Sequence, residues 1–99
     1  MKCFVLVFHH TELERQKMLD FLDTVSEVAN WRANVGAIFI ASEASDEKLA
    51  AKIHNKFPAL RFVVAQIEGD NAQGWTDEET WDFIYRPHSI DDKNEKEKA

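Results

Sequence analysis

The apolar residues of the chain gather in short runs that predict β-strands. Residues 2–8 are apolar from Cys3 onward and are rich in valine and phenylalanine. A run of this kind, with no polar residue at alternate positions, is typical of a strand covered on both faces. The segments 37–41 and 60–67 repeat the pattern. We therefore expect three strands that each need apolar cover on both sides.

A helix is predicted between the first two of these strands. From Met18 to Ala29, apolar residues recur at three- and four-residue spacing and define one apolar face. Thr11 and Glu14 precede them in the arrangement of a capping box, which would place the start of the helix just after Thr11. The pattern predicts a helix that ends near residues 29–30.

Two further helices are predicted in the second half of the chain. Ser45 is the expected N-cap of one, apolar residues follow at every fourth position, and Pro58 ends it. A second capping box, from Thr76 to Glu79, predicts a short helix that continues through Trp81 and Ile84.

The segment 31–34 decides between two folds. If it pairs with residues 37–41 as a hairpin, the element order is βαββαβ, which is the ferredoxin-like α+β fold with an added short C-terminal helix. If residues 31–41 form one strand, two right-handed crossovers give a three-stranded parallel α/β sheet. Asn34 and Gly36 tolerate the positive φ angles of a tight turn. We expect the ferredoxin-like fold and keep the parallel sheet as the alternative.

The ferredoxin-like arrangement leaves one face of the sheet without its two main helices. Strands that are apolar on both faces need a second cover. The candidates are a second copy of the chain and the C-terminal segment that carries Trp75 and Trp81. The pattern therefore predicts a homodimer.

Length and composition set further limits. The 99 residues suffice for one domain, which we expect over residues 1–88, and the charged segment 89–99 is predicted to be a disordered tail. Cys3 is the only cysteine, so an internal disulfide and a cysteine-based metal site are excluded, and we expect it to be buried. The longest apolar run has six residues, too few to cross a membrane. We expect a cytoplasmic protein without membrane contact.

The charge balance argues against binding to nucleic acid. Twelve basic and eighteen acidic residues give a net charge of −6. Proteins that bind nucleic acid tightly usually present a basic face that neutralises several phosphates. An acidic body can instead bind a basic protein, or imitate nucleic acid toward a protein that binds it. Acidity of this size also serves solubility alone.

Several segments together resemble a known group of proteins. They are the strand that ends in Val7-Phe8, the sequence Gly-Ala-Ile-Phe-Ile-Ala-Ser at 36–42, the sequence Leu-Arg-Phe-Val-Val-Ala-Gln-Ile at 60–67 and the Gln-Gly-Trp triplet at 73–75. The layout resembles the small ferredoxin-like relatives of the dimeric CRISPR adaptation subunit, which include standalone members of unknown function. The resemblance covers residues 2–85 and implies a homodimer joined with help from the C-terminal segment.

The resemblance does not extend to the catalytic position of the family. Its nuclease members place an aspartate directly after the first strand, where it holds a divalent metal across the dimer axis. In this chain Phe8 and His9 occupy that position. A neutral imidazole is a poor replacement for a carboxylate as a ligand of Mg²⁺. The resemblance therefore implies the fold and the dimer, but not the activity.

Three groups of residues could carry function. His9 and His10 could bind a transition metal if two subunits brought copies together, although adjacent strand residues point to opposite faces. A second group is a cationic stripe with a spacing of four, which could contact an anion or lie solvated beside the acidic residues of the first helix: Lys48, Lys52 and Lys56. The third is an aromatic set among acidic neighbours, typical of a protein contact rather than of base stacking: Trp75, Trp81, Phe83 and Tyr85.

The residues favour a non-catalytic interaction or regulatory module that acts as a homodimer. Its partner besides itself is expected to be another protein, and an inhibitor of a nucleic-acid-handling protein fits the acidity. No cofactor and no metal are expected. The alternative is a metal-dependent nuclease of the resembled family, with His9 in place of the missing aspartate and His10 beside it.

Overall fold

The computed structural model describes residues 1–34 and 36–89, so the predicted tail lies outside the described residues beyond Ser89. Four strands form one sheet in the order β2-β3-β1-β4, and every neighbouring pair is antiparallel. The strands are β1 (Lys2–Phe8), β2 (Asn30–Asn34), β3 (Ala37–Ser42) and β4 (Phe62–Ile67). The helices are α1 (Arg15–Leu22), α2 (Asp46–Lys56), the single 3₁₀ turn η1 (Gly69–Asn71) and α3 (Glu78–Tyr85).

The fold belongs to the predicted α+β class, and it is compatible with the ferredoxin-like arrangement. The element order is βαββαβ followed by the short helix α3. β2 and β3 pair as a hairpin from Asn30↔Ala41 to Asn34↔Ala37, and Gly36 in their turn has a φ of 78°. This positive φ favours glycine, which has no Cβ to clash. The alternative of a three-stranded parallel sheet is therefore wrong.

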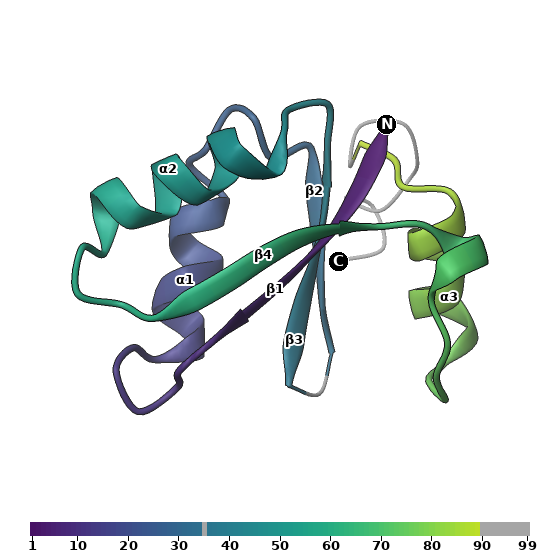
Figure 1. The fold of residues 1–99 in the computed structure, drawn as a ribbon, viewed down its shortest axis with the longest axis horizontal. Helices are drawn as coiled ribbons and strands as arrows, with labels where there is room; N and C mark the ends of the chain where they lie inside the picture. Colours follow the sequence, from purple (N-terminus) through teal and green to yellow (C-terminus); the bar gives the residue numbers. More distant parts are fainter. Residues whose placement is uncertain (35, 90–99) are drawn as a thin grey trace.

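The main core lies between the sheet and the helices α1 and α2. Alternate residues of β1 point into it, and Phe4 and Leu6 are fully buried there. Met18 of α1 and Ile53 of α2 meet them from the helical side. Figure 1 shows α1 and α2 together on one side of the sheet and α3 on the other. The core is thus lined by every second residue of the strands and by one face of each helix, as the periodicity of the sequence predicts.

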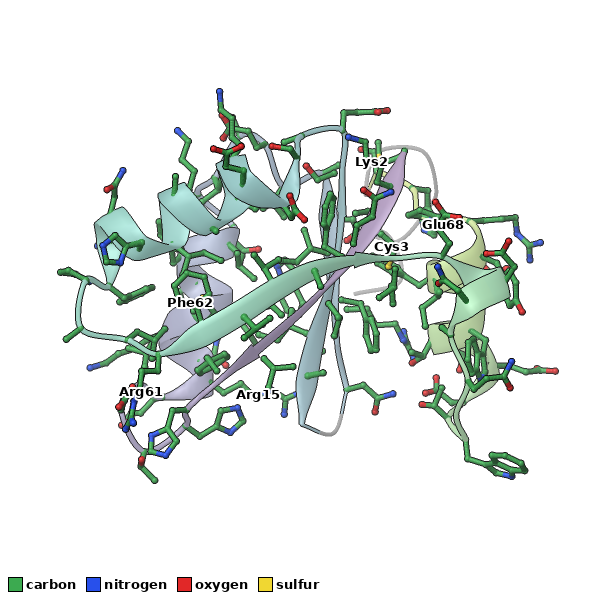
Figure 2. All side chains as sticks on the ribbon, in the orientation of Figure 1. Lys2, Cys3, Arg15, Arg61, Phe62 and Glu68 are labelled. Carbon is green, nitrogen blue, oxygen red and sulfur yellow. The ribbon has the colours of Figure 1, made fainter. Side chains whose placement is uncertain are left out.

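A smaller core lies on the opposite face of the sheet, under α3. Cys3 and Ala41, which are neighbours across β1 and β3, pack against Phe83 and Ile84 of α3. The expectation that Cys3 is buried is confirmed, since its exposed fraction is 2%. In Figure 2, Cys3 lies on β1 beside α3. The C-terminal helix is thus part of the second cover that the apolar strands require.

The predicted start and end of the first helix are wrong. α1 starts at Arg15, its N-cap is Glu14, and no side chain caps it. Thr11 is not the cap because its hydroxyl lies 2.7 Å from Nδ1 of His9. The helix ends at Leu22, and tighter turns follow, in which the hydroxyl of Thr24 donates to the carbonyl of Phe21. These turns keep later apolar residues against the core without continuing the helix.

The other predicted caps are closer to the structure. Ser45 is the N-cap of α2, as expected, and its hydroxyl accepts from the backbone N–H of Lys48 at 3.1 Å. The N-cap of α3 is Asp77 rather than Thr76, because the hydroxyl of Thr76 accepts a hydrogen bond from the amide of Asn34 on β2. The last strand starts two residues later than predicted, at Phe62.

The two faces of β1 should differ strongly in what they contribute to stability. We expect Phe4→Ala to lower the free energy of unfolding by about 3–5 kcal/mol, because it leaves a cavity in the main core. Val7→Ala, on the opposite face of the same strand, should cost less than about 1 kcal/mol, since the Val7 side chain is 47% exposed. Urea unfolding at low micromolar concentration measures both values. Equal losses would contradict this assignment of the core.

Candidate protein-interaction surface

Part of the second sheet face stays open, and we call it the open face. It consists of four aliphatic side chains in two cross-strand pairs, Val5↔Ala65 and Val7↔Val63. Val63 is 66% exposed and Val7 is 47% exposed, while Val5 and Ala65 are half-buried. Exposed aliphatic side chains that adjoin one another on a sheet are a typical contact surface.

The open face exists because α3 is short. A helix of eight residues is roughly 12 Å long, whereas the seven residues of β1 extend over roughly 23 Å. The apolar contacts of α3 lie around Cys3, at the start of β1. The end of β1 that carries Val7 therefore keeps its exposed surface.

A polar network fastens α3 to the edge strand β2. Nε of Arg32 donates to the hydroxyl of Thr80 at 2.8 Å, and a terminal nitrogen of Arg32 lies 2.6 Å from Oδ2 of Asp77. The hydroxyl of Thr80 donates in turn to Oδ1 of Asp77 at 2.7 Å, and Thr80 is fully buried. These hydrogen bonds, first that from Thr80 and then that from Arg32, hold the pKa of Asp77 well below its usual range.

The four predicted aromatic contact residues have different environments. Trp75 is fully exposed and Tyr85 is 59% exposed, so both remain available for a contact. Trp81 is half-buried, and its ring centroid lies 6.0 Å from that of Tyr85. Phe83 is only 4% exposed, so its expected place in an exposed contact region is wrong. The helical spacing of Thr80, Phe83 and Ile84 is the signal that marks this face as buried.

His9 and His10 lie exposed after β1 and do not form a metal site within the described chain. Nδ1 of His9 is 3.7 Å from a carboxylate oxygen of Glu12, but that carboxylate is held by Arg61, at 2.6 Å from its guanidinium and 2.9 Å from its backbone N–H. The Arg61 hydrogen bonds lower the pKa of Glu12. The ring of His10 packs against Phe8. Among residues 1–34 and 36–89, no group of three or more His, Cys, Asp or Glu could hold a metal ion.

The three lysines of α2 are exposed, as the pattern predicts. Within residues 1–34 and 36–89, one ion pair involves them: Nζ of Lys52 lies 3.7 Å from a carboxylate oxygen of Glu27. The acidic residues expected to face these lysines from the first helix do not all lie on it, since α1 ends at Leu22 and Glu27 lies in the turns that follow. The pKa of Glu27 is lowered by its own backbone N–H and, less strongly, by Lys52. This pairing favours a structural role for Lys52, while Lys48 and Lys56 remain candidates for anion contact.

A groove along the outer edge of β2 was not predicted from the sequence, and we call it the β2 groove. Its volume is about 1130 Å³. Residues 28–33 form its floor, the end of α1 forms one wall, and α3 with the residues after it forms the other. No local sequence signal indicates it, because it depends on where α3 packs.

Cys3 does not supply a reactive thiol. Burial raises the pKa of the Cys3 thiol to about 12, so it stays protonated near neutral pH and is not a nucleophile. Within the described residues, no helix is long and apolar enough to cross a membrane.

Comparison with known proteins does not identify a family. The chain matches no protein-family model, and the comparisons with curated proteins and with solved structures return no match. The resemblance to relatives of the CRISPR adaptation subunit therefore stays a prediction.

The polar network of Asp77 should make the protein sensitive to acid. Because the folded pKa of Asp77 lies below the ordinary value of about 3.9, its ionised form stabilises the fold above that pH, and this contribution is lost as the pH falls toward the folded pKa. We expect Asp77→Asn to lower the melting temperature at neutral pH and to reduce the further drop between about pH 5 and about pH 2.5. Glu12 and Glu27 contribute to the drop in both proteins.

Asp70→Asn is the matched control, because Asp70 is an exposed aspartate on η1. Its melting temperature should follow that of the unmodified chain over the whole pH range. If Asp77→Asn shows the same acid-induced drop as Asp70→Asn, the network does not hold α3 in place.

Proposed function

We propose that the protein is a non-catalytic interaction or regulatory module that acts as a homodimer in the cytoplasm. The open face carries this proposal, because Val7 and Val63 are exposed there while the other large apolar residues of the four strands are buried or half-buried. Burial of apolar side chains against a second copy would remove this surface from water. A twofold axis near these two residues would place each Val63 against the same patch of the other subunit.

Acidity supports a further protein partner. The net charge of −6 repels phosphate and attracts basic surfaces. An inhibitor of a nucleic-acid-handling protein remains the most specific form of this proposal. Trp75 lies just before α3 and Tyr85 is its last residue, and both are exposed aromatic side chains suited to such a contact.

The homodimer can be tested by the solution mass. At high micromolar concentration we expect light scattering to give about twice 11.5 kDa for the unmodified chain. Val63→Asp should reduce this to the mass of one subunit, because it buries a charge in the apolar contact. Gln66→Asp is the matched control: it adds the same charge on the same strand, but at an exposed position that points to the other face.

Two results would contradict the homodimer. One is the mass of a single subunit for the unmodified chain at the highest soluble concentration. The other is the mass of one subunit for both Val63→Asp and Gln66→Asp. That result would mean that any added negative charge, and not one on the open face in particular, prevents association.

The alternative function, a metal-dependent nuclease, makes a different prediction. We expect no cleavage of RNA or DNA with Mg²⁺, Mn²⁺ or Zn²⁺, because the carboxylate of Glu12 nearest to His9 is held by Arg61. Metal-dependent turnover that disappears in His9→Ala but persists in His54→Ala, an exposed histidine on α2, would overturn the non-catalytic assignment.

A further inference from the structure

The β2 groove exposes the edge of the sheet. β2 is the terminal strand in the order β2-β3-β1-β4, so β3 pairs with one of its sides and the groove lies along the other. Edge strands present backbone N–H and C=O groups that can pair with an additional strand. Floor residues 28–33 include most of β2, so an incoming chain would meet this backbone directly.

The hydrogen bonds of β2 show which backbone groups point into the groove. Asn34 and Ala37 are paired where the hairpin closes, so Asn34, Arg32 and Asn30 are the residues of β2 that exchange hydrogen bonds with β3. Trp31 lies between two of them, and its N–H donates to the side-chain oxygen of Asn30 at 2.9 Å. In an antiparallel pair, hydrogen-bonding direction alternates along the strand, so the N–H and C=O of Ala33 point the same way as those of Trp31. Trp31 and Ala33 therefore provide the outward edge, spaced as strand addition requires.

The two walls of the groove differ in chemistry. The α1 wall consists of Leu22 and Asp23. Beside it lies the apolar ring of the floor residue Trp31, whose indole N–H donates to Asp23 at 2.7 Å. The α3 wall carries three carboxylates: Glu78, Glu79 and Asp82.

Arginines compensate only part of the acidity of the groove. Arg32 pairs with Asp77 and approaches Glu79 at 3.9 Å, and Arg86 pairs with Asp82. The lining holds four carboxylates, including that of Asp23, against two guanidinium groups, so it has two negative charges in excess with His88 neutral. This excess favours a cationic occupant and disfavours a second copy of the same acidic edge.

We infer that the β2 groove binds an extended basic segment of another protein by strand addition to β2. Successive side chains of such a segment point to opposite walls. Its lysine or arginine residues at alternate positions face the carboxylates of the α3 wall, and its apolar residues face Leu22 and Trp31. The five residues of β2 match about five residues of the segment, roughly 17 Å of extended chain. The site extends the proposed function by naming a partner class, and it is separate from the open face.

The probe is a fluorescein-labelled peptide of seven alternating lysine and valine residues, and fluorescence anisotropy measures its binding. We expect saturable binding that is at least about tenfold weaker for an alternating glutamate–valine peptide. A third peptide keeps the lysines but carries backbone N-methyl groups at alternate residues. It should also bind at least about tenfold more weakly, because it cannot form the strand hydrogen bonds. Equal binding of the N-methylated peptide would overturn the proposal in favour of general charge attraction.

Variants of the protein locate the site. Glu78→Lys reverses an exposed charge in the first turn of α3 and should weaken binding about tenfold. Glu47→Lys makes the same change in the first turn of α2, away from the groove, and should leave the affinity unchanged within about twofold. Equal weakening by both would overturn the site.

Ala33→Pro tests the edge itself, because it removes an outward N–H without a change of charge. It should abolish binding while the circular dichroism spectrum stays that of the unmodified chain; retained binding in this folded variant would contradict strand addition. If Ala33→Pro unfolds, the proposal is still tested in two other ways. The N-methylated peptide tests strand addition, and the comparison of Glu78→Lys with Glu47→Lys tests the location of the site. Val63→Asp should bind the peptide normally whatever its oligomeric state, so a failed homodimer and a failed groove are distinguishable.

Discussion

The structure depends on a sheet that is apolar on both faces in a chain that carries little material to cover it. α1 and α2 cover most of one face, with Phe4, Leu6 and Ile40 at an exposed fraction of zero. The other face receives one helix of eight residues. Each apolar side chain left in water forgoes the free energy of burial, so the remainder of this face is the part of the molecule with most to gain from a partner.

Arg32 determines where that cover lies. Its guanidinium donates to Thr80 and pairs with Asp77, which places the start of α3 over β2 instead of over β4. A guanidinium can make both contacts at once because its donors are fixed in a plane, which the ammonium group of a lysine does not offer. The position of α3 then leaves Val7 and Val63 open at one end and creates a wall beside the β2 edge at the other.

The two surfaces suit different partners. The open face is aliphatic and uncharged, and a second copy of the chain presents the matching patch. The β2 groove combines backbone groups with carboxylates, a mixture that an extended cationic segment satisfies. Because one surface lies on a sheet face and the other along an edge strand, a dimer formed through the first leaves room for a partner at the second. Such an arrangement suits a small regulatory module that joins proteins without changing them chemically.

The sequence by itself determined the strands, the hairpin option, the α2 cap and the burial of Cys3, because these follow from apolar periodicity and from contacts between neighbouring residues. It also indicated that the sheet needs cover on two faces. It failed at the cap of α3, where a distant residue competes for the same polar group: the hydroxyl of Thr76 accepts a hydrogen bond from the amide of Asn34 instead of capping the helix. Only the tertiary structure decided that Val63 is exposed and that a groove follows β2. Each of these depends on where α3 packs, and that position is set by contacts more than forty residues apart in the chain.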